Sequence, residues 1–127
     1  MRRCLWLILL LFTTTSQADW QDWKDRDRAL FVASQLAITA DWATTRYASR
    51  HWDQFRPNSH ESNIFLGPYP STAKVDLYFI GLLVSNYYIT DWMPNNNYRT
   101  FYLGVRTYVH GQAAHNNQVM FGWRAQF

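Results

Sequence analysis

The segment ALFVASQLAITADWATTRYA, from Ala29 to Ala48, predicts one continuous helix because it contains neither proline nor glycine. Its length also suits a membrane span, since a helix needs about twenty residues to cross the hydrocarbon core of a bilayer. Polar side chains interrupt the apolar sequence, however: Ser34, Gln35, Thr39, Asp41, Thr44 and Thr45. The question for the fold is where these polar groups point.

Helical spacing places several residues of this segment on one face. Steps of four, three, four and three residues join the members of this face: Ser34, Ile38, Asp41, Thr45 and Ala48. The face is small and polar, a composition typical of close contacts between helices. Larger side chains are expected to point elsewhere: Leu30, Phe31, Leu36 and Trp42. Small residues in later segments predict similar contacts: Gly81 with Ser85, and Gly104 with Gly111.

Two more helices are expected, from Val75 to Trp92 and from about Tyr98 to Ala114. Pro94 and the three asparagines at 95–97 form the break between them. The connection at 49–71 contains three prolines and a glycine, which preclude a continuous helix. Ser71 or Thr72 is the expected N-cap of the second helix. The predicted fold is all-α, a small three-helix membrane-type bundle.

Residues 1–18 are predicted to be a signal peptide or an uncleaved anchor, with 19–127 as a single helical membrane-associated domain. Arg2 and Arg3 precede nine apolar residues, from Cys4 to Phe12, and a polar stretch that ends at Ala18. Residues 19–28, rich in charges and tryptophan, predict an exposed or surface-lying helical start. The last residues, 118–127, predict a short extended or surface-lying end.

Composition favours a bilayer as partner. Aromatic residues make up 18% of the chain and gather at the ends of the apolar segments, as in an interfacial aromatic belt. The mean hydropathy of −0.34 is low for an integral membrane protein, which keeps a soluble exported bundle as the alternative. We expect the bacterial inner membrane, or alternatively the periplasm, with another membrane protein or a second copy as further partners. The chain lacks a basic stripe, so nucleic acid is not expected.

The chain has no catalytic or metal-binding motif of the common types, and we predict no catalytic residue, metal or cofactor. His110 and His115 are five residues apart and would lie on different helix faces, a poor pair for a metal. A polar cluster is the candidate site, and its predicted members are Asp41, Thr44, Thr45, His60, Glu61 and Asn63. An enzyme that uses Asp41, His60 and Glu61 for acid–base chemistry is the alternative interpretation.

The chain also resembles a group of small uncharacterised bacterial and phage-associated membrane proteins. The resemblance lies in D-x-x-T-T at Asp41–Thr45, E-x-N-x-x-L-G at Glu61–Gly67 and P-S at Pro70–Ser71, and it covers about residues 35–92. Ile64 stands where those proteins usually have proline. The resemblance implies that Asp41, Thr45, Glu61 and Asn63 form one hydrogen-bonded cluster, but it implies no activity.

The function expected from the sequence is therefore structural. We expect a small integral membrane protein with a structural or interaction role in the bacterial envelope. A membrane-embedded enzyme and a soluble exported helical binding module are the two alternatives.

Overall fold

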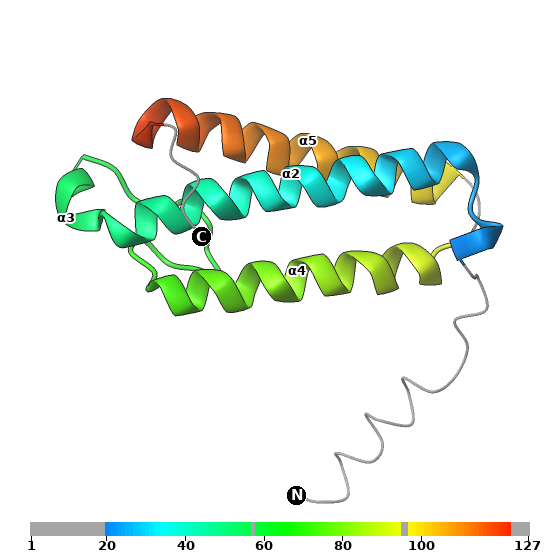
Figure 1. Cartoon of the computed structure of the whole chain (residues 1–127), viewed down its shortest axis with the longest axis horizontal. Coiled ribbons are helices and arrows are strands. Elements are labelled where there is room, and N and C mark those ends of the chain that lie inside the picture. The colour runs from blue at the N-terminus through cyan, green and yellow to red at the C-terminus, as the bar shows by residue number, and fades with distance from the viewer. Residues whose placement is uncertain (1–19, 57, 95–96, 123–127) are drawn as a thin grey trace, which may run out of the picture.

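In the computed structural model, residues 20–56, 58–94 and 97–122 are described, and they form helices and loops without a strand. The elements are η1 (Trp20–Asp22), α2 (Asp25–Arg50), α3 (Trp52–Phe55), α4 (Thr72–Trp92) and α5 (Asn97–Phe121). The three long helices lie alongside one another, with α2 packed against both α4 and α5 (Figure 1). Direct contact between α4 and α5 is slight. The all-α helical bundle is thus confirmed.

Helices α2 and α4 begin and end close to the predicted positions, whereas α5 extends seven residues beyond its predicted end at Ala114. Helix α2 extends the predicted segment at both ends, with Asp25 and Asp27 in its first turn, where carboxylates favour the positive end of the helix dipole. Ser71 is the N-cap of α4, and its hydroxyl accepts a hydrogen bond from the amide of Lys74. Gly122 follows α5 in the left-handed conformation that commonly ends a helix.

Three apolar clusters hold the helices and the connecting loop together. The first joins Ile38 of α2, Leu66 of the loop, and Val75 and Phe79 of α4. The second contains Trp23, Phe31 and Leu103 and lies at the other end of α2. The third contains Ala48, Trp52 and Phe121. Because Leu66 is almost fully buried in the first cluster, the loop is held against α2 and α4, where the candidate site lies.

The predicted face of α2 is confirmed, since all five of its members are buried: Ser34, Ile38, Asp41, Thr45 and Ala48. Its polar groups find partners on neighbouring helices. The side-chain amide of Asn86 on α4 donates to the Ser34 hydroxyl and to the side-chain oxygen of Gln35, both at 2.9 Å. The Thr100 hydroxyl on α5 donates to Asp27 at 2.8 Å. Polar contacts therefore link α2 to both neighbours.

Other predictions about packing were wrong. Gly81 and Gly111 are exposed, and a Cβ added at either position or at Gly104 would meet nothing within 4 Å, so no close helix contact uses them. Trp23 is buried although residues 19–28 were expected to form an exposed or surface-lying start, because it packs with Phe31 and Leu103 in the second apolar cluster.

The chain ends also differ from the sequence prediction where the structure covers them. Helix α5 continues to Phe121 instead of giving way to an extended end near residue 118, because Phe121 packs against Trp52 and Phe55. Residues 123–127 lie outside the described ranges. The predicted signal or anchor segment, 1–18, lies outside them too.

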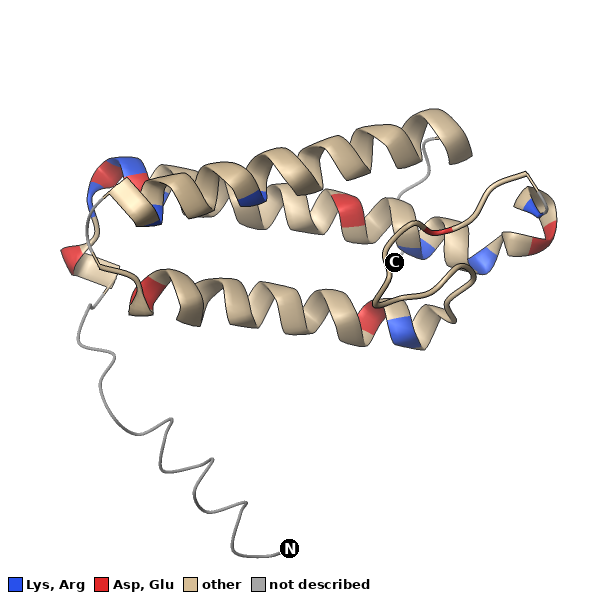
Figure 2. Cartoon of the chain, turned by 180° about the vertical axis from the view of Figure 1, so that it is seen from behind, with Lys and Arg blue, Asp and Glu red and all other residues tan. Residues whose placement is uncertain are grey.

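Charged residues concentrate at the two ends of the bundle (Figure 2). Between residues 29 and 45 of α2 the only Asp, Glu, Lys or Arg is Asp41, and between 100 and 121 of α5 it is Arg106. Residues 77–90 of α4 contain none. Within 20–56, 58–94 and 97–122, no helix is both long enough and apolar enough to cross a membrane.

Candidate functional site

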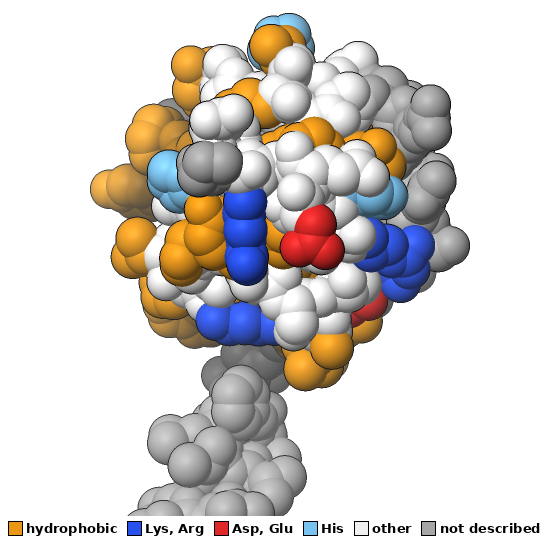
Figure 3. All heavy atoms as spheres, turned by 90° about the vertical axis from the view of Figure 1, so that its left-hand side faces the viewer, with side chains coloured by type: hydrophobic (Ala, Val, Ile, Leu, Met, Phe, Trp, Pro, Cys, Tyr) orange, Lys and Arg blue, Asp and Glu red, His pale blue; other side chains and the backbone are white. Residues whose placement is uncertain are grey.

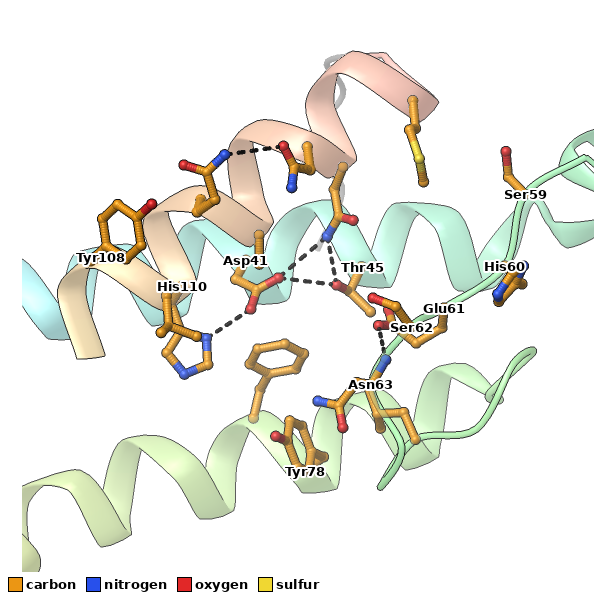
Figure 4. Close-up of a pocket in the computed structure, with 18 of the residues that line it drawn as sticks. Asp41, Thr45, Ser59, His60, Glu61, Ser62, Asn63, Tyr78, Tyr108 and His110 are labelled. Atoms are coloured by element: carbon orange, nitrogen blue, oxygen red, sulfur yellow. Dashed lines mark hydrogen bonds and ion pairs between the residues drawn. The ribbon is translucent and has the colours of Figure 1, made fainter. Parts of the chain in front are cut away.

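A cleft of about 740 Å³ lies where α5, the loop at 58–66 and α4 surround the middle of α2 (Figure 4). Asp41 and Thr45 reach it from α2, His110 from α5, and Glu61 and Asn63 from the loop. Its size falls within the usual range of small-molecule sites. The cleft brings most of the predicted polar cluster around one space.

Asp41 and His110 form a buried pair in this cleft. His110 Nδ1 lies 2.8 Å from Asp41 Oδ2, and the two side chains are only 8% and 9% exposed. An ionised carboxylate can only accept, so Nδ1 carries the hydrogen. Nε2 lies 3.5 Å from Nη1 of Arg106, whose guanidinium can only donate. The imidazole is thereby held between an acceptor and a donor in one tautomer.

The second oxygen of Asp41 joins a hydroxyl and amide network. Thr45 Oγ1 donates to Asp41 Oδ1 at 3.3 Å. The side-chain amide of Asn117 on α5 lies within hydrogen-bonding distance of Asp41 Oδ1, Thr44 Oγ1 and Thr45 Oγ1, at 3.3, 3.2 and 3.0 Å. Both D-x-x-T-T threonines therefore contact α5 through one asparagine.

His110 and Asn117 are the functional candidates that the sequence reasoning missed. The spacing of Leu103, His110 and Asn117, seven residues each, places them on one face of α5, and that repeat was the available signal. The prediction that His110 and His115 face different ways is confirmed, since His110 is buried and His115 is exposed.

The loop residues of the predicted cluster mainly shape their own turn. Glu61 Oε1 accepts a hydrogen bond from the amide of Asn63 at 2.8 Å, and Asn63 Oδ1 accepts one from the amide of Phe65 at 3.0 Å. The carbonyl of Asn63 also accepts from the amides of Leu66 and Gly67. Gly67 has φ +78°, which glycine adopts without strain. The E-x-N-x-x-L-G pattern thus encodes a tight loop.

The structure divides the predicted cluster into two parts that share the cleft. Over the residues that the structure describes, no hydrogen bond joins Asp41 or Thr45 to Glu61 or Asn63. The bonds of Asp41 go instead to Thr45, His110 and Asn117. The direct clasp between helix and loop that we expected is therefore replaced by contacts between α2 and α5. His60 lines the cleft but is exposed.

Glu61 is electrostatically unusual among these groups. Burial of its carboxyl raises its pKa above the ordinary value of 4.5, and the negative charge of Asp41 raises it further. The backbone amide of Asn63 and the charge of His60 oppose this change without cancelling it. Glu61 therefore keeps its proton to a higher pH than a solvated glutamate.

The cleft offers hydrogen-bond donors and acceptors and the side chains of Arg106 and Glu61, but its described residues form no recognised metal centre. No group of three His, Cys, Asp or Glu residues that could hold a metal occurs in the described parts of the chain. The Nδ1 of His51 lies 2.7 Å from the carbonyl oxygen of Tyr47, within its own helix turn. The enzyme interpretation placed Asp41 with His60 and Glu61, whereas the structure pairs Asp41 with His110.

Comparison with known proteins identifies no relative of this chain. No protein-family profile, no curated protein and no solved structure matches this chain.

Proposed function

We propose that this chain is a small integral membrane protein of the bacterial envelope, with a structural or interaction role rather than an enzymatic one. The observation that carries the proposal is the distribution of polarity. Polar side chains are buried between the helices, while apolar side chains face outward along their middle. The resemblance in the D-x-x-T-T and E-x-N-x-x-L-G patterns agrees with this proposal.

The interior is unusually polar for a small bundle. Nearly half of the buried residues outside the masked parts are polar or charged: Asp27, Ser34, Asp41, Thr45, Asn86, Thr90, Asp91, Arg99 and His110. Burying polar and charged groups has a free-energy cost unless they are paired. Within a membrane, ionisable residues on spanning helices typically face the interior of a bundle and pair there.

The outward face of α4 is apolar along its whole length. Leu77, Ile80, Val84 and Tyr88 follow one another at steps of three and four residues, so they form a single stripe. All four are exposed, Leu77 by 73% and Val84 by 53%.

Helices α5 and α2 also carry exposed apolar side chains. Phe101, Val105 and Tyr108 form an exposed stripe on α5, and Val32 and Leu36 form one on α2. Soluble monomers rarely expose such extended apolar surface, because exposure costs about 25 cal/mol per Å². Contact with lipid or with another membrane protein would remove that cost.

Dimensions and end groups support the same environment. The 21 residues of α4 give a length of about 31 Å at 1.5 Å per residue, close to the roughly 30 Å hydrocarbon core of a bilayer, although α4 is less apolar than a helix that spans a membrane alone. Trp92 and Tyr98 are exposed at one end of the bundle, and Phe65 is exposed at the other. Figure 3 shows Lys, Arg and His side chains interspersed with hydrophobic ones at the α3 end. Mixed aromatic and basic ends are typical of membrane interfaces.

Alkaline carbonate extraction of membranes from cells that produce the full chain tests this proposal. An integral protein stays in the membrane pellet at high pH, whereas a peripheral or exported soluble protein is released. We expect the chain to stay in the pellet and to be solubilised by a mild non-ionic detergent, which distinguishes membrane insertion from aggregation. Release into the carbonate supernatant would rule the proposal out.

A further inference from the structure

Two opposite charges line the cleft without an ion-pair partner. In the described parts of the chain, the ion pairs that a lysine or arginine forms are Arg26–Asp27, Arg28–Asp25 and Arg46–Asp76, while Asp41 is hydrogen-bonded to His110. Neither Arg106 nor Glu61 is among them, although both line the cleft. The two residues reach it from different elements, Arg106 from α5 and Glu61 from the loop.

Arg106 has no carboxylate within ion-pair distance among the described residues, and Asp41 is separated from it by the imidazole of His110. Its Nε donates to the Tyr102 hydroxyl at 3.2 Å, its Nη1 lies 3.5 Å from His110 Nε2, and its guanidinium lies over the Tyr102 ring. None of these contacts is with a carboxylate. A guanidinium is well suited to bind a phosphate, because its donors match two of the phosphate oxygens.

Glu61 presents the complementary charge. Its Oε1 accepts a hydrogen bond from the backbone amide of Asn63, and the backbone of Ser62 also favours its charged form. No lysine or arginine lies within ion-pair distance of it among the described residues. Its carboxylate is partly removed from water, so a bound cation would be favourable there. A primary ammonium, which donates up to three hydrogen bonds, is a suitable partner.

We propose that this cleft binds a zwitterion containing a phosphate and a primary ammonium, with the phosphate on Arg106 and the ammonium on Glu61. The ligand would be a lipid headgroup of the phosphatidylethanolamine type. Apolar side chains on the same cleft, Phe79, Val109 and Met120, would contact its hydrocarbon part. The choice of a lipid over a free zwitterion rests on the proposed membrane location.

The pairing predicts a selectivity among lipids. Phosphatidylglycerol offers the phosphate without an ammonium, so it would engage Arg106 alone. Phosphatidylcholine carries a quaternary ammonium that has no N–H to donate to Glu61. The full chain should therefore prefer phosphatidylethanolamine to both.

Native mass spectrometry of the detergent-purified full chain, titrated with each of the three lipids, measures this preference. We expect Glu61→Gln to lower phosphatidylethanolamine binding about tenfold, as for the loss of one charge-assisted hydrogen bond. Phosphatidylglycerol binding should be unchanged in that variant. Arg106→Gln should weaken the binding of all three lipids, and Arg106→Lys should weaken it less, because lysine keeps the positive charge but not the paired donors of the guanidinium.

Two exposed residues outside the cleft provide controls, Asp53→Asn and Arg50→Gln, which should bind like the unaltered chain. Circular dichroism confirms that each variant is folded before binding is compared. Equal binding of the three lipids by the unaltered chain, or an undiminished ethanolamine preference in Glu61→Gln, would overturn the proposal.

Soluble glycerophosphoethanolamine separates this proposal from the membrane proposal. If the chain is extracted by carbonate yet binds this compound through Glu61 and Arg106, the zwitterion site stands and the membrane location fails. If the chain stays in the membrane but shows no lipid preference, the site fails and the location stands.

Discussion

Asp41 connects α2 to α5 at the level of single residues. Its two carboxylate oxygens contact His110, Asn117 and Thr45. Sequence spacing predicted correctly that Asp41 and Thr45 share a buried face, because both lie on one helix. It could not predict His110 or Asn117 as partners, because that contact depends on how α5 is positioned against α2.

Asp41→Asn should destabilise the fold by about 1–3 kcal/mol, because it removes the charge that accepts from His110 and leaves buried donors poorly satisfied. Thermal unfolding of the purified full chain in detergent measures the effect. Asp53→Asn is the matched control, an exposed acid on α3 whose change should stay within about 0.5 kcal/mol. Equal melting temperatures for both variants would show that the Asp41 contacts do not stabilise the bundle.

Glu61→Gln should change stability in a pH-dependent way. The folded protein holds the Glu61 proton more tightly than the unfolded chain, since burial raises the folded-state pKa above 4.5. The unaltered chain therefore loses stability relative to Glu61→Gln as pH rises from 4.5 through the raised pKa. The two proteins should have the same melting temperature at lower pH. Toward neutral pH the melting temperature of Glu61→Gln should become the higher of the two. A difference that is independent of pH would contradict this account.

At the level of elements, the side chain of Arg99, at the start of α5, donates hydrogen bonds to backbone carbonyls at the end of α4. Its guanidinium donates to the carbonyl oxygens of Thr90, Asp91 and Met93, at 2.9, 3.4 and 2.6 Å, and lies 4.9 Å from the centre of the Trp23 ring. The last carbonyls of a helix otherwise lack partners. The sequence predicted the helices themselves but not this cap, because capping across a turn depends on three-dimensional proximity.

Arg99→Met should loosen the last turn of α4, because it keeps an apolar chain of similar length but leaves these carbonyls without donors. We expect a loss of about 1–3 kcal/mol in the free energy of unfolding and faster hydrogen exchange at the last amides of α4. Arg99→Lys should restore part of the protection. Arg50→Met, in the exposed last turn of α2, is the control. Unchanged exchange in Arg99→Met would argue against a capping role.

For the whole molecule, the sequence predicted three long helices well because proline, glycine and polar breaks mark their limits. It predicted their packing only in part. The polar face of α2 is buried as expected, whereas Gly81 and Gly104 make no close helix contact. Spacing within a helix shows which residues share a face, but it does not show which face meets which neighbour.

The central claim is that the outward apolar stripe of α4 lies in lipid, and a matched pair of lysine substitutions tests it most directly. Val84 lies in the middle of this stripe, while Ala73 lies on the same face in the first turn of α4, and both are exposed. At an exposed site in water, a lysine should change stability by no more than about 0.5 kcal/mol. At the centre of a bilayer it should cost about 2.5–3.5 kcal/mol.

The measurement is the fraction of each variant that stays in the membrane pellet after carbonate extraction of equal amounts of cells. We predict that Val84→Lys lowers this fraction strongly, while Ala73→Lys remains at the level of the unaltered chain. Equal retention of the two variants, or release of the unaltered chain itself, would contradict the account.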